Sequence, residues 1–485
     1  MTWETVVGLE IHAQLSCASK IFSPAPAAYC DAPNRQVREV DCGMPGALPV
    51  LNRAAVALAI RLGLALESEI CRVSEFARKH YFYPDLPKGY QISQFEYPLL
   101  RGGRLAIPSA GGEKNIGITR AHLEEDAGKL LHDADGGSGA DLNRAGAPLL
   151  EIVSEPELTG AADAVSYART MHQLVRWLGI CDGNMQEGSF RIDANISVRS
   201  AGAPLGVRCE IKNLNSFRFL EQALEYEKAR QIEVLESGGE VAQETRLFDS
   251  ARGLTRAMRD KEDAHDYRYF PDPDLPPLAV AEEWIAEIRA EMPELPRARR
   301  ARFARDFALP EYVCGVLTSS RDLADYYERT AAAFAADGAP KNAKLCANWI
   351  CGELSALLNK HDLGAAESRI SPAHLAGLLR RLAAGDISAP TAKTVLEKMW
   401  DGGETADAIV KREGLEQIGG DELETIAAEV VAAHSAQAQQ FRGGKEKLFG
   451  FFVGQMMKAS GGRANPAKAG EILRRKLSGA GETPE

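Results

Sequence analysis

Alternating polar and apolar positions predict β-strands through the first half of the chain. The clearest run lies at residues 190–199, where every second residue is apolar: Ile192, Ala194, Ile196 and Val198. After a Gly/Pro loop, residues 207–212 alternate too, with Val207, Cys209 and Ile211 expected in the core and Arg208, Glu210 and Lys212 on the polar side. The two runs predict a β-hairpin with one polar face. Further strands are predicted at 4–15, from 117 to about 127, and at 149–153, and helices at 52–66, 161–178 and 217–236.

The pattern changes at about residue 281, where proline becomes sparse and helical periodicity recurs. A chain of 485 residues is also too long for a single hydrophobic core. We therefore predict a catalytic domain at 1–292, a helical domain at 293–405 and a helical tail domain at 406–485. The expected fold class is α/β (or α+β), with a mixed or antiparallel sheet, followed by two all-α parts.

Charge is distributed unevenly along the chain, whose formal net charge is -11. Residues 441–476 carry nine Lys or Arg against Glu446 and Glu471, a local balance of 9 − 2 = +7. A nucleic-acid backbone explains this asymmetry better than a solvated helix face does. The nine cysteines form no C-x-x-C pair, which favours free thiols in a reducing compartment. The chain starts with no secretory signal, and no apolar run reaches the roughly 18 to 20 residues of a membrane span. A cytoplasmic protein is expected.

Ionisable residues on predicted strands are the first candidates for chemistry. Arg120, His122 and Glu124 alternate, so a strand turns all three to one face. A solvated edge strand would look the same. Glu10 and His12 form a similar pair, however, and Glu151 is a lone carboxylate in an apolar strand, where it needs a cation, a hydrogen-bond donor or a metal.

A second group of candidates could bind phosphate. The segment 78–93 combines Lys79 and Lys88 with Tyr81 and other tyrosines, although a packed aromatic loop has the same composition. The polar face of the predicted hairpin adds three more: Arg191, Glu210 and Lys212. The chain has neither a P-loop nor a Rossmann glycine motif, so a nucleotide site must be of another type.

Several long motifs resemble the B subunits of the aspartyl/glutamyl-tRNA amidotransferases. They are Val7–His12, Tyr81–Ser93, Gly117–Gly128, Leu150–Pro156, Glu210–Ser216, Asp266–Pro271 and Gly454–Lys458. The resemblance covers essentially the whole chain. It implies a cradle-shaped, kinase-like α/β domain, a helical domain and a helical tail that contacts tRNA.

The resemblance also implies an activity, that of a carbon–nitrogen ligase with glutamine as amido donor. In that family an amidase partner (the A subunit) releases ammonia, and a small third partner (the C subunit) completes the heterotrimeric complex. ATP activates the side-chain carboxylate of Glu-tRNA(Gln) or Asp-tRNA(Asn), and ammonia then displaces phosphate. Which tRNA is used stays open.

Residue roles follow from the resemblance as expectations. The Mg²⁺ shell is expected to comprise Glu10, His12, Glu124 or Glu125, and Glu151, with His12 the least suitable ligand because Mg²⁺ prefers oxygen. Catalytic roles are expected for Arg120, His122, Glu124, Lys79 and Lys212. ATP contacts are expected from Lys79, Lys88, Tyr81, Glu210 and Arg191. Strand alternation favours Glu124 over Glu125, but a kink towards Gly128 would reverse this.

The chain departs from its relatives in two places. Many relatives carry a four-cysteine zinc site, whereas the aligned positions here hold Ser23, Ala25, Arg38 and Asp41. We therefore expect no structural zinc. His80 replaces the usual asparagine. Two other interpretations remain: a non-catalytic tRNA-binding scaffold, which leaves Glu151 unexplained, and a free-standing metal-dependent hydrolase, which leaves the basic tail unexplained.

Overall fold

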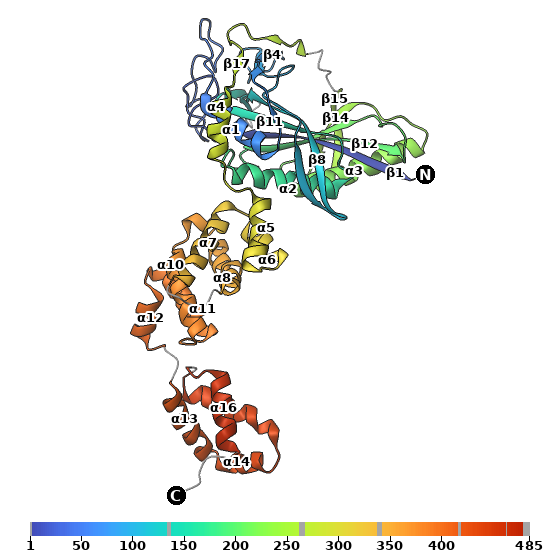
Figure 1. The fold of residues 1–485 in the computed structure, drawn as a ribbon. Coiled ribbons are helices and arrows are strands. Elements are labelled where there is room, and N and C mark those ends of the chain that lie inside the picture. The colour runs from blue at the N-terminus through green and yellow to red at the C-terminus, as the bar shows by residue number, and fades with distance from the viewer. Residues whose placement is uncertain are drawn as a thin grey trace. The chain divides into compact units, whose positions relative to one another are not determined.

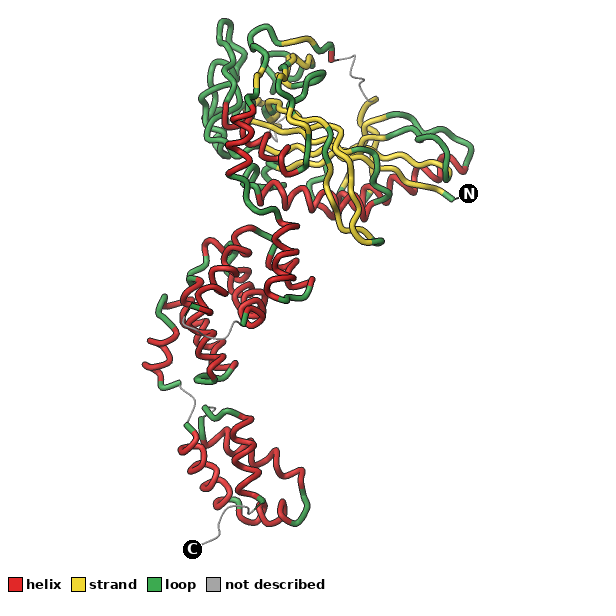
Figure 2. Tube along the Cα trace, viewed as in Figure 1, coloured by secondary structure: helices red, strands yellow, loops and turns green. Residues whose placement is uncertain are grey.

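The computed structural model describes residues 2–132, 137–260, 267–336, 342–415, 419–461 and 463–478. The chain divides into two compact units, Met1–Leu295 and Pro296–Glu485 (Figure 1). The first is built around a large mixed sheet with helices, and the described part of the second is helical (Figure 2). The expected order of a sheet domain followed by all-α structure is confirmed.

The large sheet has 13 strands, ten of which follow one path. Along that path the order is β15 (Leu254–Asp260), β14 (Glu244–Asp249), β13 (Cys209–Lys212), β12 (Phe190–Ser200), β1 (Trp3–Gln14), β11 (Pro148–Ser154), β8 (Gly112–Glu125), β5 (Tyr90–Ser93), β4 (Ala77–His80) and β16 (Phe270–Pro271). Only β13 and β14 pair in parallel along this path. Three short strands join beside it: β2 (Glu69–Ile70), β6 (Leu100–Arg101) and β7 (Arg104–Ser109). Two separate pairs are β9 (Lys129–His132) with β10 (Ser138–Asp141), and β3 (Val73–Ser74) with β17 (Leu278–Ala279).

The apolar face of the central strands forms the core of the first unit. In β1 the buried residues alternate with half-buried ones, so Val7, Leu9 and Ile11 lie in the core while Glu10 and His12 face the other way. The helices α1 (Arg53–Ala65), α2 (Ala161–Trp177) and α3 (Phe217–Glu236) pack against the sheet, and α4 (Glu282–Ala290) packs against α1 (Figure 1). Helices therefore cover one face of the central sheet, which leaves its polar face available for a site.

The local predictions for this unit largely hold. The three predicted helices match α1, α2 and α3 within two residues at each end, and side chains at Asn52 and Ser216 cap α1 and α3. The hairpin is confirmed as the antiparallel pair β12 and β13. Val207 is a correction: it is 46% exposed, because β13 begins only at Cys209. Asp266, in one of the quoted motifs, lies outside the described residues.

The second unit contains two sets of helices. The first comprises α5 (Pro296–Phe307), α6 (Glu311–Leu317), α7 (Arg321–Ala335), α8 (Ala343–Trp349), α9 (Ser355–Lys360), α10 (Pro372–Ala384), α11 (Ala389–Gly402) and α12 (Ala406–Glu413). The second comprises α13 (Gly420–Ala433), α14 (Ser435–Arg442), α15 (Phe449–Ala459) and α16 (Pro466–Leu477), which share a core of their own. The predicted boundary at 405/406 falls just before α12, which packs against α10 and α11; the division into three domains stays a prediction. None of the described helices is long and apolar enough to cross a membrane.

Candidate functional site

Strand pairing aligns four ionisable residues in one row across the polar face of the sheet. His12 on β1 lies opposite Arg191 on β12 and Glu151 on β11, and Glu151 lies opposite His122 on β8. Residues that face each other across neighbouring strands point to the same side, at the strand spacing of about 4.8 Å. The row therefore runs Arg191, His12, Glu151, His122, with one residue from each of four adjacent strands.

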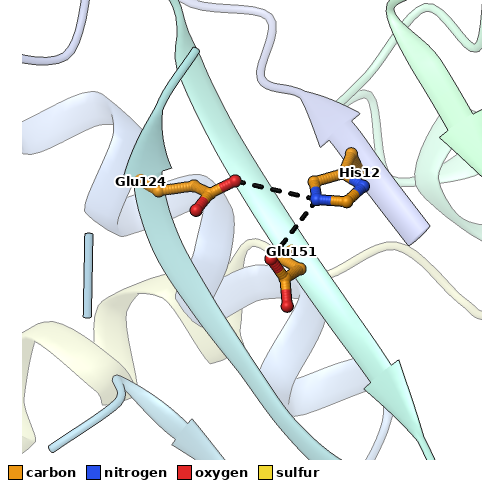
Figure 3. Close-up of side chains that lie close together, drawn as sticks. All are labelled: His12, Glu124 and Glu151. Atoms are coloured by element: carbon orange, nitrogen blue, oxygen red, sulfur yellow. Dashed lines mark ion pairs between the residues drawn. The ribbon is translucent and has the colours of Figure 1, made fainter. Parts of the chain in front are cut away.

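A compact cluster forms at the centre of this row (Figure 3). The His12 Nε2 atom lies 3.3 Å from Glu151 Oε2 and 3.8 Å from Glu124 Oε1. The His122 Nε2 atom lies 3.8 Å from a carboxylate oxygen of each glutamate. Glu124 is 2% exposed and Glu151 is 9% exposed. The structure thus brings together two buried carboxylates and two imidazoles from three strands that are far apart in the sequence.

The charges of this cluster stabilise one another. Burial raises the pKa of Glu151, but His122, His12 and Lys79 outweigh burial and hold that pKa well below its usual range. Glu124 behaves similarly: burial raises its pKa, but the nearby His122 imidazole and Lys79 lower it overall. Burial lowers the pKa of His12, but Glu151 and Glu124 raise it overall. Both carboxylates are therefore ionised at neutral pH, and their negative potential attracts a cation.

Lys79, on β4, contributes positive charge to the same region. Burial lowers the pKa of its ammonium group, but Tyr269, Glu124 and Glu151 more than offset this, so the pKa is raised. The ammonium lies 4.9 Å from the centre of the Tyr267 ring. Lys79 is therefore a permanent cation near the two carboxylates.

A second polar group continues along the same face on β12 and β13. Lys212 contacts Asp193 at 2.8 Å and Glu210 at 3.1 Å, and Thr245 donates a hydrogen bond to Glu210 at 2.9 Å. Glu10 lies opposite Asp193 and accepts a hydrogen bond of 2.8 Å from Asn195. Glu210 is buried, although the sequence placed it on a polar hairpin face that water could cover.

Four polar members of this face were missed as candidates: Asp126, Asp193, Asn195 and Thr245. Asp126 accepts a hydrogen bond of 2.9 Å from Arg191. Asp193 and Asn195 could have been found, because they alternate with Arg191 on the predicted polar face. Asp126 could have been found in the same way, because it alternates with Arg120, His122 and Glu124 in the predicted strand. Thr245 gave no such signal, since its partner Glu210 lies on a strand distant in sequence.

Glu125 and Lys88 form a pair of their own. The Lys88 ammonium lies 2.5 and 2.6 Å from the two Glu125 carboxylate oxygens, and the Ile92 backbone N–H donates to the same carboxylate at 2.8 Å. Tyr81 is nearby, with its hydroxyl 3.4 Å from the side-chain oxygen of Gln91. The chain thus uses the two successive glutamates differently, with Glu124 beside His12 and Glu125 beside Lys88.

Arg120 lies two residues before His122 on β8, opposite Val153 and Arg101. It is half-buried, and within the described part of the chain its Nε atom is buried without a hydrogen-bond partner. Its placement beside the row leaves this guanidinium group able to bind an additional acceptor.

Three donor atoms of the cluster fit a metal ion. One ligand atom each from His12, Glu124 and Glu151 lies within 4.8 Å of the others, so a common centre is at most 4.8/√3, about 2.8 Å, from each. Ligand distances to Mg²⁺ are roughly 2.0 to 2.1 Å, which small side-chain rotations would reach. Two carboxylates and one imidazole, with other positions left to water or phosphate, suit a hard or borderline divalent cation.

The segment in which the resemblance implies a zinc site in many relatives contains a buried polar cluster here. Asp41 accepts hydrogen bonds from Lys20 at 3.2 Å, Ser23 at 3.0 Å and the Arg38 backbone at 2.9 Å. Lys20 and Asp41 are both buried. The ion pair joins two parts of this segment without cysteine ligands; the expected absence of zinc stays a prediction.

Comparison with known proteins identifies the class of this sheet domain. The family model "GatB/GatE catalytic domain" matches residues 5–286, which include the whole carboxylate–imidazole cluster. A second family model, "GatB domain", matches residues 325–477 in the helical part.

Full-length relatives agree with these matches, and each is named as the B subunit of an aspartyl/glutamyl-tRNA(Asn/Gln) amidotransferase. The chain is 56% identical to the protein of Laribacter hongkongensis over 99% of its own length and all of the relative. It is 57% identical to that of Nitrosococcus oceani over 99% of its length and all of the relative, and 55% identical to that of Hydrogenovibrio crunogenus over 98% and 100%. The chain belongs to the GatB family, the B subunits of these amidotransferases.

Proposed function

We propose that this chain catalyses the ATP-dependent amidation of a misacylated tRNA. In the first step, the γ-phosphoryl group of ATP passes to the side-chain carboxylate of Glu-tRNA(Gln) or Asp-tRNA(Asn). In the second, ammonia attacks that carbonyl carbon and phosphate leaves, which yields the amide and inorganic phosphate. The observation that carries the proposal is the cluster of His12, Glu124 and Glu151, whose ligand atoms all lie within 4.8 Å of one another.

In this proposal His12, Glu124 and Glu151 hold Mg²⁺, which neutralises phosphate charge when bound. Glu10 was expected in the metal shell, but it lies outside the group of His12, Glu124 and Glu151 and accepts a hydrogen bond from Asn195. In this proposal it orients the site from the same strand face. His122, on the same strand as Glu124 and next to the strand of Glu151, holds both ligand carboxylates in place.

The cations around the cluster receive the phosphates. Lys79 and Arg120 contact the transferred phosphoryl group, and Lys212 and Arg191 act from the opposite end of the row. Asp193 holds Lys212, and Asp126 holds Arg191. Phosphoryl transfer depends mostly on such positioning and charge neutralisation. Lys88 and Glu210 are already paired with protein groups. We therefore assign them, with Tyr81, to the walls around ATP and not to direct phosphate contacts.

The sheet unit would act as a kinase-like cradle, and the chain would work in the cytoplasm in a complex. An amidase partner supplies ammonia and a small third partner completes the assembly. The tail contacts the tRNA backbone through exposed cations: Lys445, Lys447, Lys458, Arg463 and Lys468. Two further tail cations, Arg475 and Lys476, instead contact Glu424 within the tail.

An amidation assay tests the proposal. The complex of all three proteins is incubated with Glu-tRNA(Gln) or Asp-tRNA(Asn), ATP, Mg²⁺ and ammonium, and the aminoacyl group is identified after hydrolysis. Amide is expected from at least one tRNA. Glu124→Gln and Glu151→Gln should abolish it while tRNA binding is retained, and Glu225→Gln, on the exposed side of α3, is the matched control with full activity.

Two outcomes would contradict the proposal at different levels. No amide from the wild-type complex with either tRNA, despite tRNA binding, would indicate a scaffold. Full activity of Glu151→Gln would support the function but show that the cluster of His12, Glu124 and Glu151 is not part of the active site.

A further inference from the structure

A cavity of about 340 Å³ lies at the edge of the sheet, beside the proposed phosphate site. Three segments line it: 75–77, 95–97 and 268–271. The volume is at the lower end of the range for small-molecule pockets, roughly 300 to 1,000 Å³. It is therefore large enough for part of a substrate rather than for a whole tRNA end.

Aromatic rings dominate the lining. Phe95 and Tyr269 stack with their centres 4.3 Å apart and an angle of 7° between their planes. Tyr97 and Phe270 also line the cavity and are 49% and 46% exposed. Flat rings with accessible surface favour a flat, apolar ligand group, as bases do when they stack on aromatic side chains.

The charged groups of the lining argue against a phosphate at this position. Glu75 and Glu96 contribute two negative charges and Arg268 contributes one positive charge. Carboxylates repel phosphate but accept hydrogen bonds from amino and hydroxyl groups. The ligand group that fits is a neutral planar ring with N–H or O–H donors.

The cavity adjoins the cluster through Tyr269 and through the strand that leads to Phe95. Tyr269 lines the cavity, and its electrostatic interactions include Lys79, Glu124 and Glu151. Ser93, two residues before Phe95, donates a hydrogen bond of 3.2 Å to Glu124. A ligand with a ring at one end and phosphates at the other can therefore place its ring in the cavity and its phosphates towards Lys79.

The outer wall is held in place by the neighbouring strand β4. The His80 ring stacks on Phe270 at 4.9 Å, and its Nδ1 atom lies 3.1 Å from the Arg268 carbonyl oxygen. Arg78 contacts Asp272 at 3.2 Å and Asp274 at 2.8 Å. The wall is thus built before a ligand arrives, which lowers the entropic cost of binding.

We propose that this aromatic cavity, lined by Phe95, Tyr97, Tyr269 and Phe270, binds an adenine ring. The inference rests on the proposed function, in which two substrates carry adenine: ATP and the 3′-terminal adenosine of the tRNA. His80 is a positioning residue of the cavity wall.

Two inhibitors separate the cavity from the phosphate site. Adenosine carries the ring without phosphate, and Mg²⁺–tripolyphosphate carries phosphate without the ring. In the amidation assay of the complete complex, Phe95→Ala and Tyr97→Ala should raise the inhibition constant of adenosine roughly 10- to 100-fold, the effect of one lost base stack. Inhibition by tripolyphosphate should stay within about two-fold of wild type. Tyr312→Ala, at an aromatic residue that is 81% exposed in the helical unit, is the control.

The type of inhibition identifies the source of the ring. Adenosine that competes with ATP in the wild type assigns the cavity to ATP, and adenosine that competes with the aminoacyl-tRNA assigns it to the tRNA end. Tyr97→Ala keeps the test valid if Phe95→Ala fails to fold, because the Tyr97 side chain is half exposed. An unchanged adenosine inhibition constant in the folded variants overturns the inference while wild-type amide formation leaves the proposed function standing.

Discussion

Substitution of the three glutamates Glu124, Glu125 and Glu151 by glutamine separates metal binding from structural support. Each substitution removes one negative charge and keeps the side-chain shape. Glu124 and Glu151 contribute ligand atoms to the cluster, whereas Glu125 neutralises Lys88. Substitution of Glu124 or Glu151 should therefore weaken metal binding, and substitution of Glu125 should lower stability.

The size of each effect follows from the geometry. Two unit charges about 4 Å apart interact by about 4 kcal/mol at an effective dielectric constant of 20, or about a thousand-fold in affinity. Because glutamine keeps one carbonyl oxygen, we expect Glu151→Gln to weaken metal binding roughly 100-fold or more. A metal concentration of 100 times the wild-type Kd stabilises wild type by about 2.7 kcal/mol and such a variant by about 0.4 kcal/mol or less.

Glu125→Gln should behave in the opposite way. It leaves the nearly buried Lys88 ammonium without a counter-charge, and removal of one partner of a buried pair costs roughly 3 to 5 kcal/mol. For a unit of this size a loss of about 3 kcal/mol lowers the melting temperature by roughly 6 to 12 °C. Its stabilisation by metal should stay at about 2.7 kcal/mol.

Thermal unfolding of the full chain with and without Mg²⁺, together with Mn²⁺ titration followed by electron paramagnetic resonance, measures both quantities. Wild type provides the reference for each. Loss of metal stabilisation in Glu125→Gln, with retention in Glu124→Gln and Glu151→Gln, would refute the assignment and place the ligand on the other face of β8.

Two further predictions concern stability. Three side chains hydrogen-bond the Asp163 carboxylate, first among them Lys114, and lower its pKa to about 2 despite burial. The contribution of Asp163 to folding stability is therefore full above its unfolded pKa and is lost as the pH falls through about 2. The stability difference between wild type and Asp163→Asn in urea unfolding should therefore be about 1 to 2 kcal/mol near pH 6 and shrink in strong acid; a constant difference would contradict the pKa. Lys20→Met should lower the free energy of unfolding by roughly 3 to 5 kcal/mol, because Asp41 stays buried without its partner cation. The double variant Lys20→Met/Asp41→Asn should recover part of this loss, and additive single effects in the double-mutant cycle would exclude the coupling.

Strand faces could be predicted from the sequence because they depend only on alternation. Glu10 and His12 share a face in β1, and Arg191 shares one with Asp193 in β12, as predicted. Alternation also favoured Glu124 over Glu125 as the metal ligand; this stays a prediction, and the position of Glu124 beside His12 supports it. A face, however, is a property of one strand and says nothing about which strand lies next to it.

Strand order and register could not be predicted, because they depend on contacts between distant segments. His12 meets Glu151 only because β1 pairs with β11 in one particular register, and a shift by one residue would turn every side chain of the strand to the other face. The burial of Glu210 has the same origin, since its partner Thr245 arrives on β14 after the whole of α3. Val207 is exposed because the alternating pattern starts two residues before strand β13 begins at Cys209. Alternation therefore does not mark the end of a strand.

The position of the cluster within the sheet bears on its chemistry. His12, Glu124 and Glu151 lie on long central strands whose opposite face is packed against the core, so their backbones are held on both sides. Lys79 and the aromatic cavity lie instead on the short strands β4 and β16 and the loops that adjoin them. Sites on regular elements hold geometry more closely than sites on loops. The proposed metal ligands, which need fixed distances, therefore lie on the central sheet. The proposed adenine cavity lies at its edge, where a change of ring or charge should alter substrate affinity without disturbing the ligand atoms.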